Sequence, residues 1–361
     1  MSDDVYKKLA KVLDTLPNGF PAAEDGLEIK ILKKIFEPDE ADLFCDLRLK
    51  FESPEQIAER TGRPVEGLDE KLTAMWKHGQ VMGIDFGEVR VFKMLPWVFG
   101  IFEFQIDRMD REFVELCHAY EPHFGKQFFQ TGPPLMHVAP VEKDIHADHI
   151  SLHYQQISSI IEKGQSFAVS ECICKKEMDM LDNPCKKLTE VCMAIAPAPG
   201  VFDGYHWGRP ITKDEAKDLL VKTEESGLVH LSWNMQDGHF FICNCCGCCC
   251  GVLRSINDMG IPAGKVVNSH FVAVIDPDEC VACGVCADER CQVRAIEEGD
   301  DAYRVKPEAC IGCGLCVSTC PSEAISLIRK PEEECEIPPA NEDAWFEARA
   351  KARGVDFSAY K

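Results

Sequence analysis

The placement of cysteine constrains this chain more than any other sequence feature. All but three of its 21 cysteines lie between residues 172 and 320. They form a scattered group, a dense run with the sequence CNCCGCCC, and a pair of similar blocks. We expect the chain to be cytoplasmic, where thiols stay reduced, because its start MSDDVYKKLAKVLDTL has no apolar core of the signal-peptide type. So many reduced thiols predict metal ligation.

Composition limits the partners of the chain. Its formal net charge is −22, whereas nucleic acid and anionic membrane surfaces both need a basic partner. The most apolar stretch, residues 94–102, is too short to span a bilayer, and a hydrophobic content of 45% excludes a largely disordered chain. A Gly-rich dinucleotide fingerprint is not evident, so we expect neither flavin nor nicotinamide.

An internal repeat occupies the C-terminal third of the chain. The segment VIDPDECVACGVCADERCQVRAI aligns with RVKPEACIGCGLCVSTCPSEAI at a period of 30 residues. Each block contains a C-x2-C-x2-C triplet and one more distant cysteine. Such a triplet wraps three thiolates around one face of a cubane, and Gly284, Gly312 and Gly314 allow the positive φ angles of a tight loop.

The two blocks resemble the bacterial two-[4Fe–4S] ferredoxin over roughly residues 271–330. The second block fits its C-x2-C-x2-C-x3-C-P run, whereas the first has four residues before Cys291 and Gln292 in place of proline. A zinc ribbon is the alternative, but two triplets with fourth cysteines in register argue against it. In such ferredoxins the fourth ligand comes from the other block. This predicts one cluster on Cys280, Cys283, Cys286 and Cys320, and a second on Cys310, Cys313, Cys316 and Cys291. Acidic surroundings predict low potentials.

Ten further cysteines lie in residues 150–265, which read as a mixed α/β unit. We predict a helix over residues 151–163, a capping box from Thr212 to Glu215, and a hairpin that delivers the chain into CNCCGCCC. Thiolates this close repel one another unless a metal neutralises them. We expect one or two further [4Fe–4S] clusters, whose pairing the spacing does not assign. The candidate ligands are Cys172, Cys174, Cys185, Cys192, Cys243, Cys245, Cys246, Cys248, Cys249 and Cys250.

The middle cysteines allow two roles. The triplet Cys245-Cys246-Gly247 resembles the CCG motif of heterodisulfide reductase catalytic subunits, which implies an active-site cluster that acts on thiols. The alternative is a cluster that only relays electrons, which we favour. The three cysteines outside this span, Cys45, Cys117 and Cys335, are interpreted as ordinary thiols. Three histidines at helical spacing, His146, His149 and His153, are interpreted as a solvated polar face.

The N-terminal part predicts a helix, a tight turn, a second helix and a two-stranded wing over residues 27–95. Ser53 and Pro54 begin the first helix, and Gly79 ends the second. This order resembles winged helices of the MarR-like sort. Glu66, Asp69 and Glu70 open the candidate recognition helix, so we favour protein docking or dimerisation over DNA binding.

We therefore predict an α+β multidomain chain with a winged-helix-like N-terminal domain, a cysteine-rich α/β middle domain and a ferredoxin-like two-cluster domain. The expected segments are residues 1–105, a connection over 106–149, the iron–sulfur domain 150–265, the ferredoxin domain 266–332, and an acidic linker with a C-terminal helix over 333–361. The whole arrangement resembles multidomain 4Fe–4S ferredoxin-like proteins of anaerobic bacteria and archaea.

The leading hypothesis is an electron-transfer protein or subunit that passes low-potential electrons to or from a partner oxidoreductase. We expect it to be non-catalytic. The first alternative is a reductase with a catalytic iron–sulfur cluster in the middle domain. The second is an iron–sulfur redox-sensing transcription factor.

Overall fold

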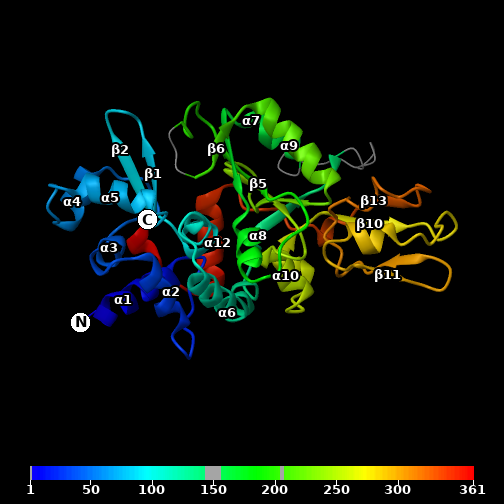
Figure 1. Ribbon diagram of the computed structural model, residues 1–361, viewed down its shortest axis with the longest axis horizontal. Coiled ribbons are helices and arrows are strands. Elements are labelled where there is room, and N and C mark those ends of the chain that lie inside the picture. The colour runs from blue at the N-terminus through cyan, green and yellow to red at the C-terminus, as the bar shows by residue number, and fades with distance from the viewer. Residues whose placement is uncertain (1, 143–155, 204–206) are drawn as a thin grey trace. The chain divides into compact units, whose positions relative to one another are not determined.

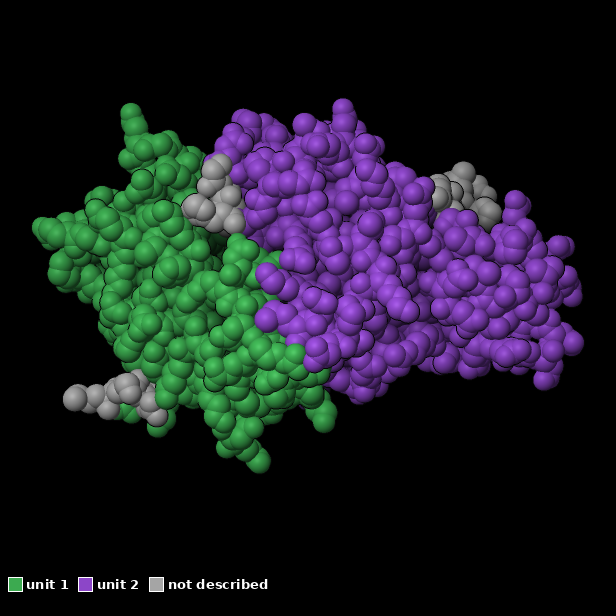
Figure 2. All heavy atoms as spheres, viewed as in Figure 1, with its two compact units in different colours: residues 1–128, 346–361 green, residues 129–345 purple. Residues whose placement is uncertain are grey.

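The computed structural model describes residues 2–142, 156–203 and 207–361. The chain forms two compact units (Figures 1 and 2). One contains residues 1–128 and 346–361, and the other contains residues 129–345. All the cysteines of the middle region and of the repeat therefore belong to the second unit. The histidine trio and residues 151–155 of the predicted helix lie outside the described residues.

The first unit is mainly helical and carries one hairpin. The strands β1 and β2 pair antiparallel, with Val81 opposite Met94. The side chain of Ser53 accepts a hydrogen bond from the backbone N–H of Gln56 and so caps α4, as predicted. Its elements are α1 (Ser2–Thr15), α2 (Leu27–Ile35), α3 (Pro38–Phe44), α4 (Pro54–Thr61), α5 (Leu68–Lys77), β1 (Val81–Asp85), β2 (Arg90–Met94) and α6 (Arg111–Phe128). The winged-helix family assignment stays a prediction.

The last residues of the chain complete the core of the first unit. The helix α12 (Glu342–Arg353) begins at the end of the second unit and continues into the first. Arg349 is 1% exposed, and its guanidinium lies 4.3 Å from the ring centroid of Phe128. Phe346 and Phe357 are also buried. The segment after 332 is thus part of the fold.

The second unit is built on a seven-stranded sheet in the order β6-β4-β5-β8-β7-β3-β9. Neighbouring strands are antiparallel except for β3 and β9, which are parallel. β3 and β9 lie outside residues 150–265, so the sheet is larger than the segment expected to form it. The strands are β3 (Met136–Ala139), β4 (Ser166–Glu171), β5 (Glu190–Ala196), β6 (Arg209–Ile211), β7 (Val229–Trp233), β8 (Phe241–Cys245) and β9 (Val267–Asn268).

Two helices cover one face of this sheet. The helices α7 (Ile157–Lys163) and α9 (Lys213–Glu225) bury an apolar cluster against Met193 of β5 and Ile242 of β8 (Figure 1). The capping box from Thr212 to Glu215 begins α9, as predicted. Three further helices follow the cysteine segments: α8 (Ile173–Met180), α10 (Gly251–Asn257) and α11 (Ala263–Val266).

The repeat blocks pair with one another through two antiparallel ladders. The strand β10 (Phe271–Ile275) of the first block pairs with β13 (Ile325–Arg329) of the second. The strand β11 (Ile296–Glu298) pairs with β12 (Tyr303–Val305). Gly284, Gly312 and Gly314 all have positive φ, as expected. No helix among the described residues is long and apolar enough to cross a membrane.

Candidate metal centres

Strand alternation positions the middle cysteines. Cys243 and Cys245 alternate along β8 with Ile242 and Asn244. Ile242 faces the apolar cluster under α7 and α9, and Asn244 accepts a 2.6 Å hydrogen bond from His230 on the same face. The two cysteines therefore project from the opposite face. Cys192 precedes Met193, which pairs with Ile242, so it lies beside Cys243 across the β5–β8 ladder.

Six of the ten middle cysteines form a closed ring in which each sulfur is hydrogen-bonded to two others. They come from the turn into α8, from β5, from β8, and from the N-cap of α10. We call this group the six-cysteine ring. In order around the ring, its members are Cys172, Cys174, Cys250, Cys245, Cys243 and Cys192.

Hydrogen bonding makes alternate sulfurs of the ring acidic. Thiol donors at Cys192 and Cys245 lower the pKa of Cys243 to about 6. In the same way, two neighbouring thiols hold the pKa of Cys172 and that of Cys250 well below the ordinary value. The same hydrogen bonds hold the pKa values of Cys174, Cys192 and Cys245 well above the ordinary value. The thiolate is the form that binds metal, so a metal centre on the whole ring would displace the protons that these sulfurs share.

The remaining four middle cysteines form a separate group, which we call the four-cysteine set. Their sulfurs all lie within 4.8 Å of one another. The Cys185 sulfur is 3.7 Å from that of Cys246, which is 3.3 Å from that of Cys248. Hydrogen bonds from Cys246 and then Cys249 lower the pKa of Cys248 to about 4. Four thiols that converge in this way could hold a metal ion, and their number matches both a tetrahedral zinc site and one [4Fe–4S] cluster. The members are Cys185, Cys246, Cys248 and Cys249.

A buried lysine lies beside both groups. Lys175 of α8 is 2% exposed, and its ammonium donates a hydrogen bond to the carbonyl of Leu188. Its positive charge stabilises the thiolate forms of Cys172 in the ring and Cys246 in the four-cysteine set. The sequence did not point to Lys175 as a functional residue, because lysine side chains are mostly exposed in folded proteins.

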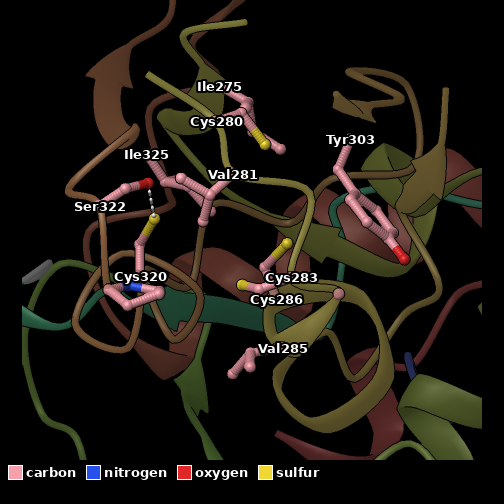
Figure 3. Close-up of a pocket in the computed structure, with 12 residues that line it drawn as sticks. Ile275, Cys280, Val281, Cys283, Val285, Cys286, Tyr303, Cys320, Ser322 and Ile325 are labelled. Carbon is pink, nitrogen blue, oxygen red and sulfur yellow. Dashed lines mark hydrogen bonds between the residues drawn. The ribbon is translucent and has the colours of Figure 1, made fainter. Parts of the chain in front are cut away.

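The repeat blocks bring their cysteines together in two groups. Figure 3 shows the first, a pocket that Val281 and Tyr303 line beside four cysteine side chains. The Cys320 sulfur lies 3.7 Å from the hydroxyl of Ser322. Cys283 is exposed and Cys286 is buried, so this pocket reaches the surface. Its cysteines are Cys280, Cys283, Cys286 and Cys320, the four that the sequence analysis assigns to one cluster. The ligation itself stays a prediction.

The second group of the repeat is more enclosed. Burial, and to a smaller extent the neighbouring Cys310 and Cys291, raise the pKa of Cys313 to about 12. Backbone N–H groups donate to two of its sulfurs, from Ala295 to Cys291 at 3.1 Å and from Gly312 to Cys310 at 3.4 Å. Such N–H donors stabilise thiolate and tune a bound cluster. The fourth cysteine near them is Cys316.

Residues 273–327 match the family model of the 4Fe-4S dicluster domain. The matched residues span both repeat blocks and all eight of their cysteines. The protein therefore carries [4Fe–4S] clusters, and its C-terminal part is an iron–sulfur electron-transfer domain. Comparison with curated proteins and with solved structures gives no match.

The dicluster domain contacts the dense cysteine run directly. Gln292, which stands where the ferredoxin run has proline, accepts a 3.1 Å hydrogen bond from the backbone N–H of Gly247. Its carbonyl accepts a second bond, of 2.9 Å, from the side chain of Asn257. A Cβ atom at Gly247 would lie 2.0 Å from that carbonyl oxygen, so only glycine permits this approach. Gln292 adjoins Cys291, and Gly247 lies between Cys246 and Cys248.

A buried arginine reinforces the same junction. Arg290 is 8% exposed, and its guanidinium donates to the carbonyls of Leu315, Glu225 and Glu224 at 3.0, 2.9 and 3.0 Å. It thus joins both repeat blocks to the C-terminal end of α9. The first block departs from the ferredoxin run by one extra residue before Cys291 and by Gln292 in place of proline. This departure was the sequence signal for the junction, but the sequence alone does not show that Gln292 makes this contact.

The three outlying cysteines are apart from these groups. Cys45 and Cys117 are buried in the first unit. The Cys45 thiol donates to the carbonyl of Ala41, and burial raises its pKa to about 12. Cys335 is half-buried in the second unit. Its thiol donates to the carbonyl of Lys330. A thiol with a raised pKa behaves as a small apolar side chain.

Proposed function

We propose that the protein is a multi-cluster electron carrier, in which the dicluster domain exchanges electrons with the centres of the middle region. Cys280, Cys283, Cys286 and Cys320 would hold one [4Fe–4S] cluster, and Cys291, Cys310, Cys313 and Cys316 the other. The partner is an oxidoreductase that donates or accepts low-potential electrons. Bound clusters would supply one-electron chemistry. The residues of the chain hold them, set their charge environment and exclude water.

The observation that carries this proposal is the junction between Gln292 and Gly247. It connects the cysteine environments of the two regions through one hydrogen bond, because Cys291 adjoins one partner and Cys246 and Cys248 adjoin the other. Electron transfer across such a contact does not require a substrate pocket. The junction supports a relay of electrons between the regions.

The exposure of the first cysteine group of the dicluster domain supports transfer of electrons from this group to a partner protein. Cys283 is exposed, and Val281 beside it is 64% exposed. The second group is more buried, with Cys316 only 7% exposed. An electron path from the enclosed centres to this exposed edge fits a carrier that serves another protein.

The charges of the first unit count against the transcription-factor alternative. Lys71, one of the few basic residues of α5, pairs with Asp39 at 2.5 Å. Asp69 at the start of the same helix pairs with Arg90 of β2. These pairs use the cations that phosphate binding requires. Phe86 is 68% exposed at the β1–β2 turn, which supports a protein-docking role for this hairpin.

Stepwise anaerobic reduction followed by EPR tests the proposal. Full-length protein is titrated with a low-potential dye, and iron, sulfide and zinc are measured on the same samples. We expect the dicluster signals and a middle-region signal to be reduced in turn, without substrate, and to equilibrate after mixing with substoichiometric dye. Zinc in place of iron on the middle cysteines, or a middle signal that never equilibrates, would refute the relay.

A turnover assay separates the reductase alternative. Protein reduced by dye as the sole donor is mixed with thiol and disulfide substrates. Sustained substrate reduction that Cys248→Ser abolishes would favour a catalytic cluster over a relay. The carrier proposal expects no turnover, and transfer to an added oxidoreductase that declines with salt.

A further inference from the structure

We infer that the six-cysteine ring binds a single iron–sulfur centre that contains more than four irons, distinct from the centre on the four-cysteine set. The inference rests on the proposed function only in taking the middle region to bind iron and sulfide. It goes further in assigning ten cysteines to two centres of different size.

The ligand count carries the first step. Each iron of a cubane takes one protein thiolate, so a [4Fe–4S] cluster uses four. Both groups of the dicluster domain contain four cysteines, and so does the four-cysteine set. The ring contains six, and each of its sulfurs touches two others. A single cubane would leave two ring cysteines unused in a polar cluster that is otherwise closed.

The arrangement of the chain carries the second step. The ring sulfurs of Cys192, Cys243 and Cys245 project from the face of β5 and β8 that is turned away from α7 and α9. In the four-cysteine set, three members follow the end of β8, and the fourth, Cys185, lies between α8 and β5. Cysteines of both groups pack in one apolar cluster with Met178 and Val191. The sulfur–sulfur hydrogen bonds of the described residues nevertheless join ring members to ring members and members of the four-cysteine set to one another. The two groups are therefore separate ligand sets.

The surroundings of the ring carry the third step. Cys172, Cys245 and Cys250 are each less than 9% exposed. Alanine and phenylalanine side chains continue the same sheet face, from Ala168 and Ala196 to Phe202. Several thiolates in such a site repel one another strongly, and the nearby cation of Lys175 offsets one charge only. A polynuclear iron core supplies the remaining positive charge.

Iron counting on full-length protein tests this inference. In the ring variant, alternate members are replaced together: Cys174→Ser, Cys192→Ser and Cys245→Ser. The comparison variant carries Cys246→Ser and Cys248→Ser in the four-cysteine set, and Cys117→Ser in the first unit is the matched control. Relative to wild type, we expect the ring variant to lose more than four irons and the comparison variant to lose about four or fewer. The control should lose none.

Single substitutions guard against misfolding. Each of the six ring cysteines is changed to serine alone, and Mössbauer spectra of iron-57-labelled protein are recorded. We expect all six variants to change the same spectral component. If two of the six leave iron content and spectrum unchanged, or the ring variant loses only four irons, the ring holds a cubane and the inference is wrong. Retained dicluster signals in every variant keep this outcome separate from failure of the electron-carrier proposal.

Discussion

Single residues decide how closely the dicluster domain approaches the dense cysteine run. Glycine is the only residue type that fits at position 247, because any Cβ atom there would collide with the backbone carbonyl oxygen of Gln292. We expect Gly247→Ala to destabilise this contact by about 1–3 kcal/mol, the usual cost of overpacking. It should also slow electron equilibration between the two regions. Anaerobic urea denaturation and dye-mixing kinetics measure the two effects.

Gly264→Ala is the matched control for that substitution. Gly264 lies in α11 of the same unit, and a Cβ atom there would meet no atom within 4 Å. The same chemical change should leave the equilibration rate unaltered and stability unchanged or slightly raised. Equal effects of the two variants would contradict the role given to the junction.

The low pKa of His239 predicts that the folding stability of the second unit depends on pH. Burial, and then the neighbouring His137 ring at 5.3 Å, lower the pKa of His239 to about 3 from an ordinary value near 6.5. The folded state therefore disfavours the proton. The corresponding stability is present above pH 6.5 and is lost as the pH falls towards 3.

At pH 5.5 this loss amounts to about 1 kcal/mol relative to neutral pH. We expect His239→Gln to reduce the slope of unfolding free energy against pH between 7.5 and 5.5, as measured by urea denaturation of the second unit. Because cluster stability also depends on pH, the difference between variant and wild type is the quantity to compare. Identical slopes would show that His239 becomes protonated without cost.

At the scale of elements, α8 links the two middle centres. Its N-terminal turn carries Cys172, Cys174 and the buried Lys175. Removing this cation should favour the oxidised form of nearby clusters, because the reduced form carries more negative charge. We expect Lys175→Met to lower middle-region potentials by on the order of 50 mV, which corresponds to about a tenfold change for one electron. EPR-monitored potentiometry measures the shift.

The control for that shift is Lys186→Met. Lys186 adjoins Cys185 in sequence but is exposed, so solvent screens its charge. Its loss should move the potentials far less. A comparable shift from both variants would mean that burial of Lys175 is not what matters.

Elements with local signals could be predicted from sequence, and those built by long-range pairing could not. The caps at Ser53 and Thr212 identify α4 and α9, because capping depends on residues three positions apart. The ring depends instead on the β5–β8 ladder, which brings Cys192 beside Cys243. Spacing along the chain carries no information about that register. The alternation in FICNC was the one local hint of a shared face.

At the scale of the whole molecule, the eight cysteines of the repeat were the most predictable feature, since one short motif specifies each triplet. The match of residues 273–327 to the dicluster family covers these blocks. The partition of the chain was less predictable. The sheet takes β3 and β9 from beyond residues 150–265, and the last sixteen residues belong to the N-terminal unit. Both depend on contacts between residues far apart in sequence.

The return of the C-terminal segment yields a prediction for the intact chain. A truncation after Trp345 removes the buried Phe346, Arg349 and Phe357 from the first unit. It also removes the 3.0 Å ion pair between Arg353 and Asp14. We expect the first unit to lose at least about 3 kcal/mol of stability, the cost of deleting one large buried aromatic side chain. The iron content of the second unit should be unchanged.

Limited proteolysis and iron analysis distinguish these outcomes on one sample. Rapid cleavage within residues 1–128, with full iron retained, is the expected result, because the ligands and the sheet that positions them all lie in residues 129–345. Lys351→Met tests the segment without truncation, since that side chain is exposed on α12 and its loss should alter neither property. If truncation removed iron as well, the two units would be coupled in folding, and the cysteine centres would depend on the N-terminal domain for their assembly.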